Sequence, residues 1–146
     1  MMEINDEVES EMAKVTERVE KDEIFLLCDT IREVSYAIHK YLHRGHLEKV
    51  YENALAHRLR KMGLKVVHQY PIKVYDEDGT LLGNFIADLF VEDKLVLELK
   101  ACATLTTDHY GQVNGYLRAS KIEHGLLINF GSQKIEIKKM YQSLKP

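Results

Sequence analysis

The chain has 146 residues, of which 45% are hydrophobic and 29% are charged, a composition that fits one globular domain with a core of its own. No apolar run approaches the roughly 20 residues of a membrane span, and the N-terminus lacks the basic start and apolar centre of a signal peptide. We therefore expect a cytoplasmic protein that does not enter a membrane. Cys28 and Cys102 form neither a CxxC nor a zinc pattern, so we expect reduced thiols.

The net charge of −3 is unevenly distributed along the chain. Residues 1–23 contain nine acids and three bases, a net of −6, whereas residues 24–146 contain 17 bases and 14 acids, a net of +3. The acidic segment has weak helical periodicity, so we expect an N-terminal extension, either helical or frayed, that is solvated or contacts a partner. Residues 24–146 are expected to form a single domain, whose mildly basic charge is compatible with nucleic-acid binding without demanding it.

The domain begins with two expected amphipathic helices, residues 24–43 and 47–62, in which apolar residues recur with helical spacing. Strands are expected at residues 65–75, 80–91 and 94–100, followed by a helix at 104–119 and strands at 125–130 and 134–138. Pro71 places the first strand near a sheet edge or at a bulge, and Gly83 indicates a bulge or bend in the second. The order α-α-β-β-β-α-β-β predicts an α/β protein of the α+β mixed-sheet kind, with helices packed on the sheet.

Two of the expected strands carry charge where burial should exclude it: Asp88 in one, and Glu98 and Lys100 in the next. Burying an unpaired charge is costly, so these groups are expected to serve a purpose. Two carboxylates that converge with a lysine would suit a divalent-metal site that acts on phosphate. The alternative is a buried ion pair that only holds the hairpin together.

The loop between these two strands decides whether the two carboxylates share a face. A two-residue loop, Glu92-Asp93, would pair Asp88 with Leu97 and leave Glu98 on the other face. A three-residue loop that includes Lys94 would pair Asp88 directly with Glu98. The metal-site hypothesis therefore predicts an odd-length loop or a bulge.

The helices on either side offer further polar residues. Glu48 borders the apolar face of the second helix and could reach a metal from there. His109, Gln112 and Tyr116 share one face of the later helix, where a glutamine could hold a phosphate or a water and a tyrosine could contact a nucleic-acid backbone. The simpler alternative is a solvated glutamate and a helix with polar tips over the core.

Taken together, these residues resemble a known family. Gly45-x-x-Glu48-x-x-Tyr51 resembles the signature of the GxxExxY family, a branch of the PD-(D/E)XK nuclease superfamily. Asp88 followed by Glu98-x-Lys100 resembles the central motif of that superfamily, with Ala87 where its name has proline. Gln112-x-x-x-Tyr116 is similar to the additional helix motif of its exonuclease-like branch. The resemblance covers about residues 30 to 132.

The resemblance implies a restriction-endonuclease-like α-β-β-β-α-β core, here preceded by an extra helical segment. It implies metal ligands at Glu48, Asp88 and Glu98, holding Mg²⁺ or Mn²⁺, and a catalytic lysine at Lys100. We add Gln112 to the catalytic set, and we expect substrate contacts from Tyr51, His109 and Tyr116.

Two functions of different classes are compatible with the sequence. The first is a Mg²⁺-dependent nuclease that hydrolyses phosphodiester bonds of DNA, with RNA as the second choice of substrate. The second is a nuclease fold used as a non-catalytic binding or assembly module, in which the acidic segment contacts a partner or a second copy in a homodimer.

Overall fold

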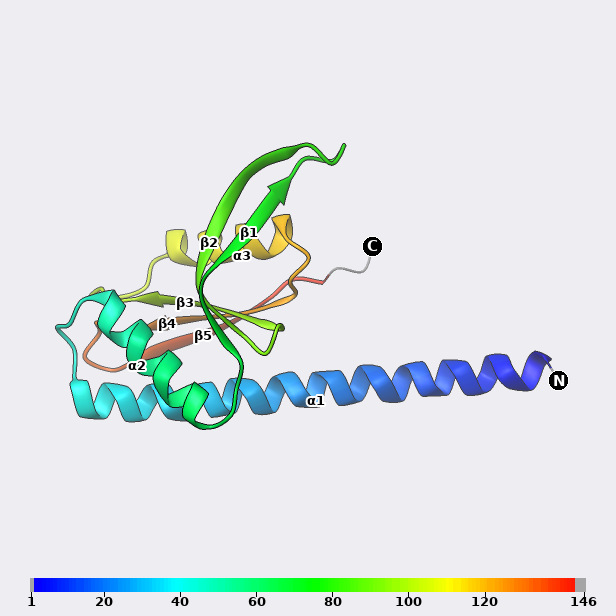
Figure 1. Cartoon of the computed structure of the whole chain (residues 1–146), viewed down its shortest axis with the longest axis horizontal. Coiled ribbons are helices and arrows are strands. Elements are labelled where there is room, and N and C mark those ends of the chain that lie inside the picture. The colour runs from blue at the N-terminus through cyan, green and yellow to red at the C-terminus, as the bar shows by residue number, and fades with distance from the viewer. Residues whose placement is uncertain (1, 144–146) are drawn as a thin grey trace.

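The computed structural model describes residues 2–143, and within them three helices pack against a five-stranded sheet (Figure 1). The helices are α1 (Met2–Leu42), α2 (Glu48–Lys61) and α3 (Thr107–Ala119). The strands are β1 (Val66–Tyr75), β2 (Leu81–Val91), β3 (Leu95–Lys100), β4 (His124–Asn129) and β5 (Glu136–Tyr141). Met1, the first residue of the expected acidic segment, and residues 144–146, the last of the expected domain, lie outside the described residues.

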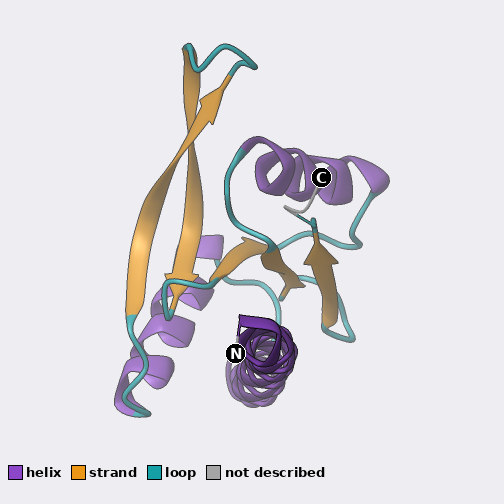
Figure 2. Ribbon diagram, turned by 90° about the vertical axis from the view of Figure 1, so that its right-hand side faces the viewer, coloured by secondary structure: helices purple, strands orange, loops and turns teal. Residues whose placement is uncertain are grey.

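The sheet has the order β1-β2-β3-β4-β5, and all neighbours are antiparallel except β3 and β4, which are parallel. A parallel pair needs a crossover connection, and α3 supplies it. Helices α1 and α2 lie on one face of the sheet and α3 lies on the other (Figure 2). The predicted element order and the mixed α+β class are confirmed, and the run from α2 to β4 has the expected α-β-β-β-α-β order.

The hydrophobic core has its larger part between the sheet and the first two helices. Ile31 and Ile38 of α1 and Leu55 of α2 are fully buried there against apolar side chains of β2, β3 and β4. A smaller cluster lies under α3, around Val113 and Leu117. Because both faces of the sheet are covered, residues 95–97 of the central strand β3 are apolar and buried on both faces, and the charged residues Glu98 and Lys100 follow at its end.

Several local expectations are met, one open alternative is decided and one strand boundary is corrected. Pro71 lies on β1, which is an edge strand, and the register of the β1–β2 pair shifts beside Gly83. Helix α1 begins at Met2 and continues without a break past residue 23, so the described part of the acidic segment is helix and not a frayed arm. The last strand begins at Glu136 instead of Lys134, because Ser132 bonds to the Lys134 carbonyl and closes a turn there.

The hairpin of β1 and β2 extends beyond the rest of the sheet as a long twisted ribbon (Figures 1 and 2). Strand β2 pairs with β1 along most of its length, from Val91 to Leu81. It pairs with β3 over three residues alone, Leu89 to Val91. Strand β2 therefore separates from β3 near the middle of β2 and continues paired with β1 alone.

The loop between β2 and β3 has three residues, Glu92 to Lys94, and joins the paired residues Val91 and Leu95. Its first two residues have positive φ angles of 54° and 56°. The predicted odd-length loop is confirmed. The register that it sets, continued by one step, places Asp88 opposite Glu98 on one face of the sheet.

Shortening this loop tests the register. Deletion of Asp93 should slip the pairing by one residue and turn Glu98 to the other face, which we expect to lower the free energy of unfolding by more than about 3 kcal/mol. Asp93→Gly is the matched control. It also removes the exposed ion pair to Lys65, but it keeps the loop length and suits a positive φ, so it should cost less than about 1 kcal/mol. Urea titration measures both, and a deletion no more costly than the control would contradict the register.

Candidate active site

Asp88 and Glu98 lie where β2 and β3 part. The backbone N–H of Asp88 donates a hydrogen bond to Glu98 Oε1 at 3.1 Å, and the N–H of Leu99 donates to Asp88 Oδ2 at 2.8 Å. Each carboxylate thus binds the backbone of the opposite strand where a sheet would have a carbonyl oxygen. The two side chains hold the fork between the strands open and satisfy its backbone donors.

The carboxyl groups at this fork resist ionisation. Burial and the charge of Asp88 raise the pKa of Glu98 from 4.5 to about 8. Burial and the nearby Glu52 raise the pKa of Asp88, against the lowering effect of its bond from Leu99. Burial and Asp88 also raise the pKa of Glu48, at the start of α2. If all three carboxyl groups were ionised, their negative charges would therefore not be fully offset by the protein groups around them.

Such a set of groups fits a hard divalent cation in its chemistry. Carboxylate oxygens are the ligands that Mg²⁺ takes from proteins, and a cation would offset the repulsion between Asp88 and Glu98. Among the described side chains, those of residues 5–143, no three acidic, histidine or cysteine groups are gathered closely enough to hold an ion. The donor groups are present, and the carboxylates of Asp88 and Glu98 accept hydrogen bonds from backbone N–H groups.

Lys100 and helix α3 close the other side of the site. Lys100 lies two residues after Glu98 and thus on the same face of β3, and its Nζ is 3.5 Å from Gln112 Oε1. The side chain of Tyr116 lies one turn along α3, near enough to Gln112 for the amide to lower the pKa of its hydroxyl against the larger effect of burial. His109, one turn before Gln112, lies near enough to Glu48 to lower the pKa of that carboxyl group against the larger effect of burial. The structure thus gathers the polar side of α3 beside the fork.

The ring of Tyr116 has a second contact. It stacks on Phe85 of β2, and burial raises the pKa of its hydroxyl. This stacking ties the projecting β1–β2 hairpin to α3 across the site.

Tyr51 has a different position from the one that its place in the motif suggested. Its side chain is fully buried, with its ring stacked on Phe130. The hydroxyl donates to the His43 carbonyl at 2.6 Å and accepts from the His46 N–H at 3.2 Å. A buried ring whose hydroxyl holds the loop between α1 and α2 offers no surface to a substrate, so we replace the expected substrate contact by this structural role.

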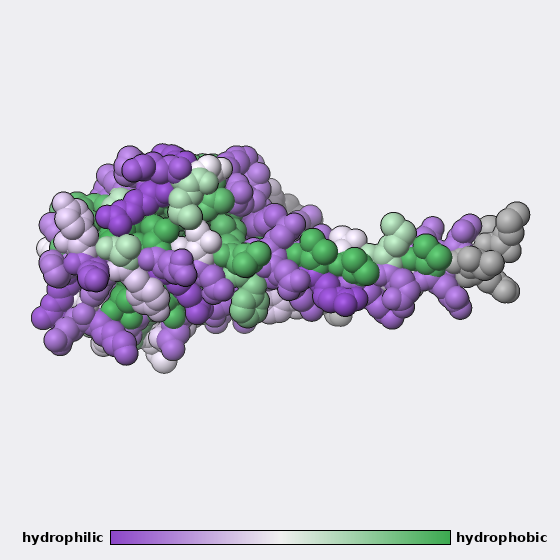
Figure 3. All heavy atoms as spheres, turned by 90° about the horizontal axis from the view of Figure 1, so that it is seen from below, coloured by the Kyte–Doolittle hydropathy of each residue, from purple (hydrophilic) through white to green (hydrophobic). Residues whose placement is uncertain are grey.

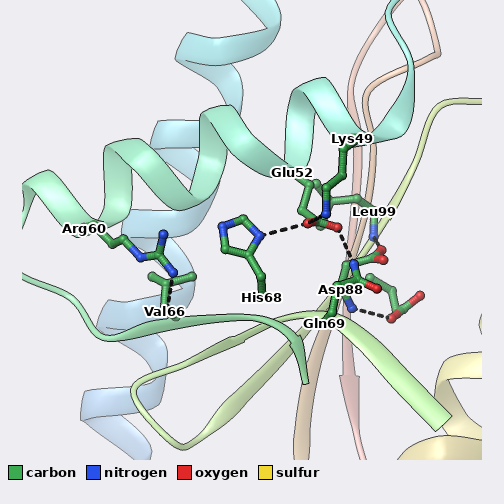
Figure 4. Close-up of polar contacts among 9 residues, drawn as sticks. Lys49, Glu52, Arg60, Val66, His68, Gln69, Asp88 and Leu99 are labelled. Carbon is green, nitrogen blue, oxygen red and sulfur yellow. Dashed lines mark hydrogen bonds and ion pairs between the residues drawn. The ribbon is translucent and has the colours of Figure 1, made fainter. Parts of the chain in front are cut away.

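Sequence reasoning missed Glu52, which is almost fully buried one turn after Glu48. Its carboxylate accepts bonds from Lys49 Nζ at 2.7 Å and Gln69 Nε2 at 2.8 Å, and its Oε2 lies 2.8 Å from His68 Nδ1 (Figure 4). The sequence held one signal for it: an acid on the apolar side of an amphipathic helix, next to the buried Tyr51.

Gln69 marks a distortion of β1 at the same level as the fork. The register of the β1–β2 pair places it opposite Asp88, and its φ is 51°. A non-glycine residue with positive φ inside a strand is strained, and such strain persists where surrounding contacts hold it. Its bond to Glu52 is such a contact, so the distortion and the fork lie side by side on neighbouring strands.

Comparisons with known proteins give one family match and one similar fold. The profile of the PD-(D/E)XK nuclease superfamily matches residues 26–140. Among solved structures, the crystal structure of SSO0001 is similar, with a TM-score of 0.51 and 16% identity over 66% of this chain and 50% of that chain. The chain spans half the length of that protein, and at this identity the likeness concerns the fold alone. A search of curated proteins finds no match.

The raised pKa of Glu98 predicts how stability depends on pH. The pKa in the fold, about 8, exceeds the ordinary 4.5, so the folded state binds this proton more tightly and is favoured at low pH. The advantage is complete below about pH 4.5 and is lost as the pH rises through about 8.

We therefore expect the melting temperature of the metal-free protein to fall as the pH rises through this range, and Glu98→Gln, which does not titrate, to reduce the fall. Glu77→Gln removes an exposed acid at the hairpin tip and should keep the wild-type slope. Equal slopes for all three proteins would contradict the assignment.

The bonds of Glu52 predict a difference between two neighbouring glutamates. Glu52→Ala should lower the free energy of unfolding by about 2–4 kcal/mol, because it leaves partners of a buried charge without their acceptor. Glu48→Ala removes an exposed acid from the first turn of the same helix and should cost less than about 1 kcal/mol. Guanidinium titration compares the two, and similar costs would contradict the role of Glu52.

Proposed function

This chain belongs to the PD-(D/E)XK nuclease superfamily, whose profile matches residues 26–140, and on that premise we propose that it is a metal-dependent nuclease of the GxxExxY branch. DNA is the first proposed substrate and RNA the second. One observation carries the proposal: Asp88 and Glu98 face each other across an open fork of strands, with Lys100 on the same face. Burial and the other carboxylates nearby raise the pKa of both groups, and the nearby Lys100 offsets only part of the rise.

Each residue of the proposed site has a distinct role. Asp88 and Glu98, with Glu48 from α2, would hold Mg²⁺ or Mn²⁺. The cation would polarise the phosphoryl group and stabilise the charge that develops on it. Lys100 would add a positive charge beside that position. Its ammonium is near enough to lower the pKa of Asp88 and Glu98, and its Nζ also contacts Gln112 of α3.

Binding of a metal in this site requires ionised carboxylates, and this requirement makes affinity depend on pH. Because Glu98 holds its proton up to about pH 8, a cation has to displace that proton, and the apparent affinity should rise with pH. The cation must also replace backbone N–H groups as the partner of the carboxylate oxygens. Both effects oppose binding of the cation, and the first is smallest at high pH, so we expect metal binding to be strongest at pH 8 and above.

The substrate side of the proposal rests on charge and shape. The domain after residue 23 has a net charge of +3, which suits a phosphate backbone. The β1–β2 hairpin and α3 both lie beside the fork (Figures 1 and 2), and we propose His109 and Tyr116 of α3 as contacts to the nucleic-acid strand. None of the described helices meets the length and apolarity that a membrane crossing requires, and we keep the cytoplasm as the proposed location.

Nuclease assays with matched variants test this function. We expect the purified chain to cleave single- or double-stranded DNA, or RNA, with Mg²⁺ or Mn²⁺ and to be inactive with a chelator. Asp88→Asn and Lys100→Ala should each lose roughly 100- to 1,000-fold in rate. Lys94→Ala, which removes an exposed lysine paired with Glu23, should keep wild-type activity.

Metal binding separates the two roles. In calorimetry at pH 8, Asp88→Asn should lose Mn²⁺ binding, whereas Lys100→Ala should retain it. Absence of metal-dependent cleavage on every substrate, together with absence of metal binding, would overturn the nuclease assignment and favour the non-catalytic module. That alternative has one observation in its favour: the carboxylates of the fork already bind the strands on either side.

A further inference from the structure

The first half of α1 stands clear of the domain. Side chains from Asn5 to Glu23 are all exposed, and the buried residues of this helix begin at Ile24. Figure 1 shows the N-terminal half of α1 extending past the sheet. Isolated helices gain most of their stability from packing of an apolar face, so a long helical segment without such packing calls for a partner.

This segment carries an apolar stripe of its own. Figure 3 shows a line of hydrophobic side chains along the projecting helix. Its members, each about half exposed or more, are Val8, Met12, Val15 and Val19. Their spacing of four, three and four residues is that of alternating core positions in a coiled coil.

The stripe is distinct from the face that binds the domain. At roughly 100° per residue, Val8, Met12, Val15 and Val19 point within about 40° of one direction. Ala13, Glu20 and Ile24 point to roughly the opposite side, and they line a groove against the domain. The stripe therefore faces away from the domain, and no described residue covers it.

We propose that this stripe is a dimer interface, on which α1 of a second copy of the chain packs in antiparallel orientation. With Met12 placed against Val15 of the second copy, Val8 meets Val19, and the same contacts repeat by two-fold symmetry. Four apolar layers then form from two stripes. Because the stripe lies on the projecting half of α1, the two domains lie at opposite ends of the paired helices.

Flanking charges support this orientation, and the charge at one core position distinguishes it from a parallel pair. In the antiparallel register Glu11 lies beside Arg18 of the second copy, and this oppositely charged pair occurs twice. The next core layer joins Asn5 to Asp22, an amide to a carboxylate. A parallel pair in register would instead place Asp22 against Asp22, a like-charge contact at a core position. The net charge of −6 of each segment comes mostly from residues outside these contacts, where salt at about 0.15 M screens it beyond roughly 8 Å.

The oligomeric state of the full chain tests the interface. We expect sedimentation equilibrium to give a dimer at micromolar concentration and about 0.15 M salt. Val15→Glu puts a charge into both central layers and should weaken dimerisation more than about 100-fold. Ser10→Glu adds the same charge on the opposite side of the helix and should leave the dimer intact. A monomeric wild type, or equal effects of the two variants, would overturn the proposal.

A charge swap tests the orientation. Glu11→Arg and Arg18→Glu each create two like-charge contacts in the antiparallel dimer and should weaken it roughly tenfold. The double variant restores opposite charges and should recover wild-type affinity. In a parallel dimer Arg18 would lie beside Glu23 of the second copy, so Arg18→Glu would weaken that dimer and the double variant would not recover. Failure of the double variant to recover would overturn the antiparallel arrangement. Both measurements are independent of nuclease activity.

Discussion

The exchange of hydrogen bonds between Asp88 and Glu98 and each other's strands is the interaction on which the site depends. Strand β2 has to leave β3 so that it can continue as the outer hairpin with β1, and that departure exposes backbone donors in a buried region. Two carboxylates satisfy the donors and at the same time bring two negative charges together. The carboxylates thus satisfy the backbone N–H groups that the separation of the strands exposes. Carboxylates are also the groups that bind Mg²⁺ in proteins.

The same constraint orders the surrounding residues. Glu98 and Lys100 share a face because they lie two apart on a strand, and α3 covers that face because it is the crossover between β3 and β4. Glu52 and Gln69 support the opposite side of the fork, where Gln69 holds a strained backbone angle beside Asp88. The chain belongs to the PD-(D/E)XK superfamily. The residues that resemble the central motif of that superfamily are the carboxylates clustered at the fork.

The sequence was informative where a local rule applied. Periodicity predicted every helix and strand, and the charges of Asp88 and Glu98 predicted an odd loop because only that register lets them share a face. It was uninformative where a contact depends on distant segments: the carboxylate of Glu52 binds residues of β1 that lie 16 and 17 positions later in the chain. Tyr51 is a second case: its place in the motif suggested a substrate contact, but its side chain is fully buried in the core.

Helix α1 passes from the acidic segment into the hydrophobic core without a hinge. A flexible tail would let anything attached to it explore a sphere around the domain, with a local concentration set by chain statistics. A continuous helix does the opposite, because whatever binds residues 5–23 is held in one direction and at a fixed reach, on the order of 30 Å from the core. The segment is therefore a rigid spacer and not a flexible tether, and the number of its residues sets the distance between the core and whatever binds the segment.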